Sequence, residues 1–426
     1  MKKIVLLIVL LSSLVVARGE GIRFFEGTFQ EALQRAKAEG KKVFVDFYTT
    51  WCGPCKLLSD RVFPNDEVGV CFNERFVNYR VNAEDKTFAA EVKRYGVKAY
   101  PTLLILDPDG NVIARQEGAL EIDGLKRFAL LALKEVLPLD QLYEKYRKDK
   151  KNLELVRAML LDAPDFLARL SGQDYDKWEF RVERLYADYD KQKSLEQRVN
   201  REDFKVFTLY HPEAVKNDRV LNHVAAHYGD YVREVEPMEV SGYLFELSFM
   251  LTRELARKGD MDYLKELERV KGDLKPVYDS LMNFAGMDAY TGLKMLFEAE
   301  YYLYNKKDVD RYCRDMDTYF ARLGEGVGYR DYLGAVDALY EALGEKLTIE
   351  VAKHGAVWLQ NALKFPVKPD EQMRGLIMLG DCFKTTGEKE KAKKSYEQAY
   401  VVSLQFNNPA LSASVQDYVK KLDEVK

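Results

Sequence analysis

The chain has 426 residues, more than one ordinary hydrophobic core holds, so two or three domains are expected. Its 65 basic and 69 acidic residues give a formal net charge of −4. The two signs are interspersed along the chain, which leaves no basic stripe for nucleic acid and no acidic tail. The composition therefore indicates a soluble globular protein with no nucleic-acid partner.

The N-terminus has the pattern of an export signal. Residues 1–17 read MKKIVLLIVLLSSLVVA: two lysines, an apolar run and a small residue. This pattern predicts a signal peptide cleaved after Ala17 or Gly19. A retained membrane anchor is the alternative, although the run is shorter than the ~20 residues that a span needs. The compact apolar segment is typical of bacteria, and the C-terminal LDEVK is no endoplasmic-reticulum signal, so we expect a periplasmic protein.

The segment 22–137 alternates helical and strand patterns. The run 41–48, KKVFVDFY, is apolar almost throughout, which indicates a central strand covered on both faces. Asp-Pro-Asp-Gly at 107–110 joins two strand-like runs as a hairpin. The expected elements are a helix at 28–40, strand 41–48, helix 56–63, strand 76–83, helix 87–96, a hairpin at 102–118 and a helix at 122–137. This order predicts a small α/β domain.

The segment 138–426 loses the strand pattern, and amphipathic helical stretches follow one another to its end. The clearest pair, at 373–404, resembles a tetratricopeptide repeat, with small and large residues alternating at Gly380, Ala392, Tyr396 and Ala399. We therefore predict an all-α domain resembling a repeat array, with an unrelated helical bundle as the alternative. Such a domain is expected to bind a protein or peptide partner.

Cys52 and Cys55 stand where the strand 41–48 gives way to the helix 56–63. A thiolate is the attacking species in disulfide exchange, and the unpaired N–H groups at a helix N-terminus favour it. Pro54 suits the first helical turn, where a missing N–H costs nothing. We expect the Cys52 sulfur to be exposed and Cys55, one turn further, to be more buried but within disulfide reach.

The stretch Trp51-Cys52-Gly53-Pro54-Cys55-Lys56 resembles the thioredoxin active site. The likeness extends over Thr28–Leu137, so we predict a thioredoxin fold for 22–137. It implies that Cys52 attacks a partner disulfide and that Cys55 resolves the mixed disulfide. No cofactor is expected.

Further landmarks carry the same resemblance. Asp46 matches the buried aspartate that helps to deprotonate the second cysteine, and Arg80 falls where thioredoxins place a lysine close to it. Tyr100-Pro101-Thr102 matches the cis-proline loop, and Gly118-Ala119-Leu120 the glycine segment beside the substrate groove. The residues expected to bind an extended substrate are Trp51, Gly53, Pro54, Tyr100, Pro101 and Gly118.

Two departures bear on partner choice. The segment 62–76 is longer than in a short thioredoxin. It resembles secreted thioredoxin-like domains and the terminal domain of transmembrane electron-transfer reductases. Thr49 and Thr50 replace the usual alanine and acidic residue.

Simpler interpretations of these residues fit the sequence less well. A structural disulfide would not need Trp51, Asp46 or Pro101, and a zinc site lacks a second Cys-x-x-Cys, so no metal is expected. Asp46 is either the base or only a partner of Arg80. His223 and His227 lack a third ligand, which favours a packing or solvated role.

The remaining cysteines are Cys71, Cys313 and Cys382, for which buried thiols are the simplest interpretation. A disulfide between Cys313 and Cys382 is left open.

These patterns together predict a periplasmic thiol-disulfide oxidoreductase that acts on disulfide-containing proteins. Gly53-Pro54 favours a reductase or isomerase, and a reductase in that compartment needs a membrane electron donor. A non-catalytic interaction scaffold and an oxidative-folding enzyme are the alternatives.

Overall fold

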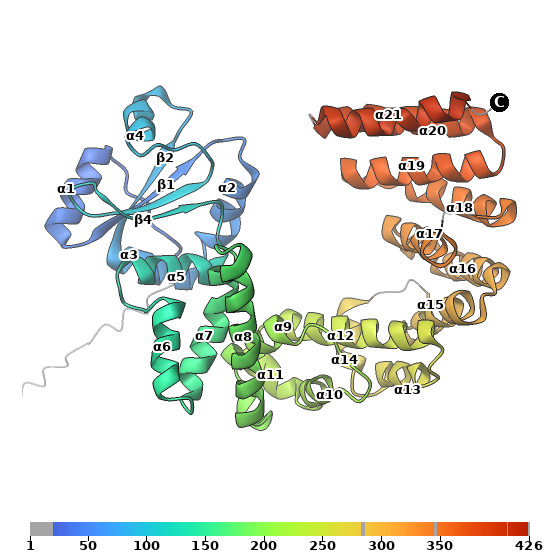
Figure 1. Cartoon of the computed structure of the whole chain (residues 1–426), viewed down its shortest axis with the longest axis horizontal. Coiled ribbons are helices and arrows are strands. Elements are labelled where there is room, and N and C mark those ends of the chain that lie inside the picture. The colour runs from blue at the N-terminus through green and yellow to red at the C-terminus, as the bar shows by residue number, and fades with distance from the viewer. Residues whose placement is uncertain (1–19, 283–285, 345–346, 407, 425–426) are drawn as a thin grey trace, which may run out of the picture. The chain divides into compact units, whose positions relative to one another are not determined.

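The computed structural model describes residues 20–282, 286–344, 347–406 and 408–424. The predicted signal peptide, 1–17, lies outside these residues. The chain forms two compact units, which divide between Leu185 and Tyr186 (Figure 1). Within the described ranges, no helix has the length and apolar character needed to cross a membrane.

The first unit contains a four-stranded mixed sheet in the order β2-β1-β3-β4, with β1 parallel to β2 and antiparallel to β3. Its elements are α1 (Phe29–Glu39), β1 (Lys42–Tyr48), α2 (Gly53–Leu57), the π-helical turn η1 (Leu58–Val62), α3 (Asp66–Arg75), β2 (Phe76–Asn82), the 3-10 turn η2 (Lys86–Phe88), α4 (Ala89–Arg94), β3 (Thr102–Leu106), β4 (Val112–Glu117) and α5 (Ile122–Ala132). This α/β arrangement confirms the predicted fold class.

Helices follow the sheet within the same compact unit. They are α6 (Leu139–Lys148), α7 (Leu153–Leu167) and the first part of α8 (Gly172–Gln192). The helix predicted over 122–137 ends at Ala132, because Lys134 adopts a left-handed backbone (φ 59°) that stops the helix.

Strand β1 is buried on both faces, as its apolar run predicted. Val43, Val45 and Phe47 join the cluster beneath α1 and α4. Phe44 joins the opposite cluster, which α3, α5 and η1 cover. Since side chains alternate along a strand, Asp46 shares the face of Phe44, so its carboxyl lies in an apolar layer.

The second unit is all-helical among its described residues, as predicted. Its helices are α9 (Arg201–Tyr210), α10 (Arg219–Ala226), α11 (Tyr228–Glu234), α12 (Pro237–Lys258), α13 (Tyr263–Glu268), α14 (Lys275–Leu281), α15 (Ala289–Tyr301), α16 (Val309–Leu323), α17 (Tyr329–Leu343), α18 (Ile349–Ala362), α19 (Pro369–Thr385), α20 (Lys389–Ser403) and α21 (Pro409–Glu424). From α17 onward each helix packs on the next one in the sequence (Figure 1).

Helices α19 and α20 form a close hairpin around Gly380. A Cβ atom at this position would lie 2.3 Å from Cε1 of Tyr396, so only glycine lets the ring approach the α19 backbone. The Tyr396 hydroxyl donates a hydrogen bond to Asp381 Oδ1 at 2.7 Å. This small-against-large contact is the one that the sequence pattern at 373–404 predicts; the repeat resemblance itself stays a prediction.

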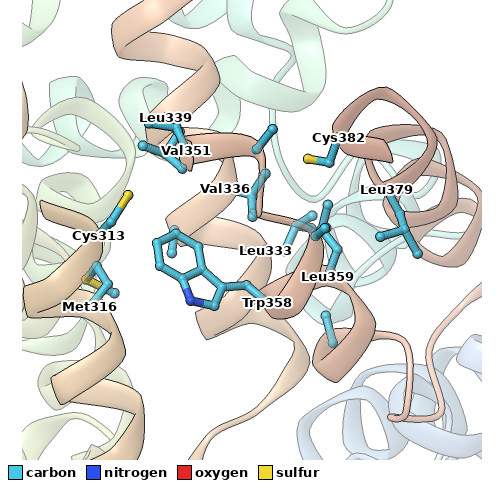
Figure 2. Close-up of a cluster of buried hydrophobic side chains, with 14 of the residues drawn as sticks. Cys313, Met316, Leu333, Val336, Leu339, Val351, Trp358, Leu359, Leu379 and Cys382 are labelled. Carbon is cyan, nitrogen blue, oxygen red and sulfur yellow. The ribbon is translucent and has the colours of Figure 1, made fainter. Parts of the chain in front are cut away.

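The core of this unit contains several apolar clusters and a buried acid. Trp358 is 1% exposed at the centre of the cluster that Figure 2 shows, and its indole donates to Asp317 Oδ1. Glu300, 2% exposed, accepts hydrogen bonds from Arg253 and Arg257 of α12. This carboxylate therefore ties α15 to α12.

The three cysteines outside the motif are buried free thiols. Cys313 and Cys382 lie on either side of Trp358 in the view of Figure 2, so the disulfide left open for them is not formed. Burial raises the pKa of Cys313 to about 12 and that of Cys382 to about 11.

Candidate active site

Cys52 and Cys55 form a disulfide at the start of α2, with an S–S distance of 2.06 Å. Cys52 caps the helix: its Sγ accepts a hydrogen bond from the backbone N–H of Cys55 at 3.1 Å. The N–H groups at this helix end favour negative charge on the Cys52 sulfur once the disulfide opens.

The expected difference in exposure between the two cysteines is absent in this bonded state. Each residue is 3% exposed. The prediction that the Cys52 sulfur is exposed is therefore wrong for the bonded pair, in which both cysteines are buried. Gly53 and Pro54, between them, are exposed.

An exposed aromatic rim adjoins the disulfide. Trp51 is 69% exposed, and its ring meets that of Tyr100 edge-on, with the centroids 6.1 Å apart. The Tyr100-Pro101 peptide bond is cis, and the Gly118 N–H donates to the Pro101 carbonyl at 2.8 Å. Because β3 starts at Thr102 opposite Phe47 of β1, this loop lies at the end of β1 that leads into the cysteines.

Asp46 is fully buried below the motif. Its Oδ2 accepts a hydrogen bond from Arg80 Nε at 3.0 Å, across the β1–β2 pairing. Its Oδ1 has no hydrogen-bond partner among the described residues. Burial raises the pKa of Asp46 to about 6, although the cation of Arg80 opposes this rise. The carboxyl is therefore able to exchange a proton near neutral pH.

The Arg80 guanidinium is held between aromatic rings. Its carbon lies 4.2 Å from the ring centroid of Tyr48, 5.3 Å from that of Phe24 and 5.6 Å from that of Phe63. Arginine stays charged at any physiological pH, and its planar fork stacks on aromatic faces. The three rings therefore hold the guanidinium of Arg80 in a fixed position and orientation beside Asp46.

Sequence reasoning placed Arg80 close to Asp46 but missed the third member of this group, Ser59. Arg80 Nη2 donates to Ser59 Oγ at 2.9 Å, and Ser59 Oγ donates to the Cys55 carbonyl at 3.1 Å. The signal was available: Ser59 follows Cys55 by four residues, which places it on the same helical face.

Thr49 and Thr50 hold the loop that leads from β1 to Cys52. The N–H and hydroxyl of Thr50 both donate to Glu84 Oε2 at 2.6 Å, which lowers the pKa of Glu84. Thr49 is buried, and its carbonyl accepts from the Cys52 N–H. These contacts hold the loop from the end of β1 to Cys52.

The histidine pair is separate from this site. The rings of His223 and His227 lie 4.2 Å apart, and burial lowers the pKa of His223. No group of three potential metal ligands from His, Cys, Asp and Glu occurs in the part of the chain that the structure describes.

Comparison with known proteins identifies the family of the α/β domain. A family model described as a thioredoxin-like domain matches residues 29–130. Thioredoxin from Pseudomonas aeruginosa is 35% identical over 92 residues, which cover 22% of this chain and 79% of that protein. The chain belongs to the thioredoxin superfamily. The resemblance predicted from the cysteine motif is thus confirmed, and the thioredoxin-like domain with its bonded pair is that of a thiol-disulfide oxidoreductase.

Two further relatives match the thioredoxin-like domain alone. The thiol:disulfide interchange protein DsbD of Pseudomonas fluorescens is 30% identical over 95 residues, which cover 22% of this chain and 16% of that protein. A solution structure from Bacteroides thetaiotaomicron, described as a candidate disulphide-isomerase, is 43% identical. It covers 28% of this chain and is itself covered completely, with a TM-score of 0.26.

Proposed function

We propose that this protein is a periplasmic thiol-disulfide oxidoreductase that reduces or isomerises the disulfides of other proteins. The observation that carries the proposal is the Cys52–Cys55 disulfide at the start of α2, with the buried Asp46 carboxyl on β1 beneath it. The exposed ring of Trp51 and the cis peptide before Pro101 supply a surface for an extended substrate.

The reaction starts from the reduced pair. The Cys52 thiolate attacks a partner disulfide, and the partner's other sulfur leaves as a thiolate. The Cys55 thiol then gives its proton to Asp46 and attacks the Cys52 sulfur. The bond between Cys52 and the partner breaks, so the partner leaves with both sulfurs reduced. The product is the Cys52–Cys55 disulfide of this structure, and two electrons have passed to the partner.

The direction of electron flow is part of the proposal. Reducing thioredoxin and a strongly oxidising periplasmic enzyme differ by about 150 mV, equivalent to roughly 7 kcal/mol for two electrons. Gly53-Pro54 is the dipeptide of the reducing enzymes that the motif resembles, which supports a reductase or isomerase. Reduction of the Cys52–Cys55 disulfide after each turnover requires electrons from a membrane donor.

The compartment rests on the leader-like sequence at 1–17, supported by the similarity to an interchange protein. Fusion of residues 1–30 to a reporter that is active only after export tests it; the same fusion with the apolar run interrupted by two arginines is the control.

The helical unit is proposed to bind a protein or peptide partner. A groove of about 950 Å³ lies between α18, α19 and α20. Its apolar floor includes Leu376 and Leu379, and the exposed side chains of Val357 and Val401 border it. The rest of its lining is mostly polar: Gln360, Asn361, Leu363, Lys364, Gln372, Lys394, Glu397, Gln398 and Val402. Such a mixture suits a polypeptide with apolar side chains.

Insulin reduction by the full chain tests the activity, with Cys52→Ser and Asp46→Asn as variants. We expect turnover that Cys52→Ser abolishes and Asp46→Asn slows. A scaffold would show no turnover to lose. Equilibration with glutathione separates the remaining alternative, since an oxidising enzyme would hold its thiols reduced far more readily than a reductase. Cys55→Ser stalls the mixed disulfide and allows the captured client to be identified.

A further inference from the structure

The hydroxyl of Ser59 joins the Asp46–Arg80 ion pair to the backbone of Cys55. Ser59 belongs to the π-helical turn η1, which follows α2 without a break. Its Oγ lies 2.9 Å from Arg80 Nη2 and 3.1 Å from the Cys55 carbonyl oxygen. A serine that bonds the carbonyl four residues earlier is common in helices. What distinguishes Ser59 is the cation on the same oxygen.

The roles in this chain of hydrogen bonds are fixed by chemistry. A guanidinium has donors only, so Ser59 Oγ must accept from Arg80, and the single hydroxyl proton is left for the Cys55 carbonyl. Arg80 in turn cannot move freely, because its Nε is bonded to Asp46 and aromatic rings surround its plane. The side chains of Ser59 and Arg80 therefore link the Cys55 backbone to the Asp46 carboxylate.

The geometry leaves one acceptor of Asp46 free. Oδ2 is engaged by Arg80, and Oδ1 has no partner in the described part of the chain. In the resolving step, the Cys55 S–H gives its proton to this carboxylate. The new thiolate forms a bond to the Cys52 sulfur, and the Cys52–partner bond breaks with the electron pair on the partner's sulfur.

We propose that Ser59 is a positioning residue for this resolving step: it holds Cys55 and its base in one bonded unit. The inference rests on the proposed role of Asp46. It predicts that loss of the hydroxyl slows the attack by Cys55 more than the attack by Cys52, because Ser59 links Cys55 to its base, whereas the Cys52 sulfur is favoured by the N–H groups of the helix end.

Stopped-flow reaction of the reduced full chain with 5,5′-dithiobis(2-nitrobenzoate) resolves the two attacks. The first coloured thiolate is released when Cys52 forms the mixed disulfide, and the second when Cys55 displaces the remaining aryl thiolate. For Ser59→Ala we expect a first phase that changes little and a second phase slowed about tenfold relative to it, the equivalent of one lost hydrogen bond. Ser59→Thr keeps a hydroxyl at this position and should restore most of the second phase.

Ser395→Ala is the matched control. Ser395 is buried in α20 of the second unit, and its hydroxyl donates to the Lys391 carbonyl at 3.0 Å, the same four-residue bond in a helix without the Cys52–Cys55 pair. We expect both phases of this variant to match those of the parent protein.

The inference is overturned if Ser59→Ala leaves the ratio of the two rates unchanged, or if Thr at this position fails to rescue the second phase. If the alanine variant does not fold, Ser59→Val compared with Ser59→Thr gives the same test, because valine has the shape of threonine without the hydroxyl and leaves the Arg80–Asp46 pair in place. Asp46→Asn distinguishes failure of the proposed function from failure of this inference. A normal second phase in Asp46→Asn would show that Asp46 is not the base. A slow second phase in Asp46→Asn together with a normal one in Ser59→Ala would overturn only the role of Ser59.

Discussion

Replacing Asp46 by asparagine is expected to stabilise the thioredoxin-like domain at high pH while it slows catalysis. Burial raises the pKa of Asp46 from 3.8 to about 6, so the folded protein binds this proton more tightly than the unfolded chain. Stability from the neutral carboxyl is thus fully present below pH 3.8 and is lost as the pH rises to 6. At about 1.4 kcal/mol per pH unit, the loss reaches roughly 3 kcal/mol.

Asparagine keeps the shape of the carboxyl and has no proton to lose. The Asp46→Asn variant should therefore exceed the parent's free energy of unfolding by up to about 3 kcal/mol at pH 8, and the difference should vanish near pH 4. Native-state hydrogen exchange of peptides from β1 and β3, corrected for the intrinsic rate at each pH, reports this domain within the full chain.

Asp109→Asn serves as the control. Asp109 is exposed and forms a surface ion pair with Lys37, so its replacement should change the same free energy by less than about 0.5 kcal/mol at every pH. The reasoning fails if the effect of Asp46→Asn does not depend on pH, or if the variant is the less stable protein at pH 8.

Other substitutions test the helical unit and the rim. Gly380→Ala places a Cβ 2.3 Å from the Tyr396 ring and should lower the urea-unfolding free energy by about 2 kcal/mol. Gly334→Ala, whose added Cβ meets nothing within 4 Å, should raise it by up to about 1 kcal/mol, and equal effects would contradict the packing argument. Glu300→Gln removes the carboxylate that pairs with Arg253, while Arg257 keeps Glu341, and should cost about 3 kcal/mol, measured by circular dichroism in urea. Trp51→Ala should raise KM in insulin reduction with a stability change below about 0.5 kcal/mol; an unaltered KM would remove the ring from the substrate surface.

The sequence was informative where local chemistry and burial agree. The apolar run at 41–48 predicted a strand covered on both faces, and β1 is buried on both sides of the sheet. The cysteine spacing at a strand–helix junction predicted a disulfide at a helix N-terminus, where Cys52 caps α2. Both patterns are contained in a few consecutive residues.

Contacts between distant segments were not accessible in this way. Nothing in the sequence around Phe24 and Phe63 predicts that they contact Arg80, because their rings meet it only after the sheet has formed. The free state of Cys313 and Cys382 depends on how separate helices pack around Trp358. Ser59 lies between these cases: its spacing from Cys55 is local, but the cation that it meets, Arg80, comes from strand β2.

The burial of the spare cysteines gives the protein a built-in report of its own state. Cys71, Cys313 and Cys382 are shielded thiols whose pKa burial raises, so they resist alkylation while the fold persists. An electrophile should therefore react with the Cys52 thiolate, which the helix N-terminus favours, in a reduced native molecule, with no sulfur in an oxidised one, and with all five after reduction and unfolding. The mass added by the electrophile would then distinguish the reduced native protein from the oxidised native protein and from the unfolded one.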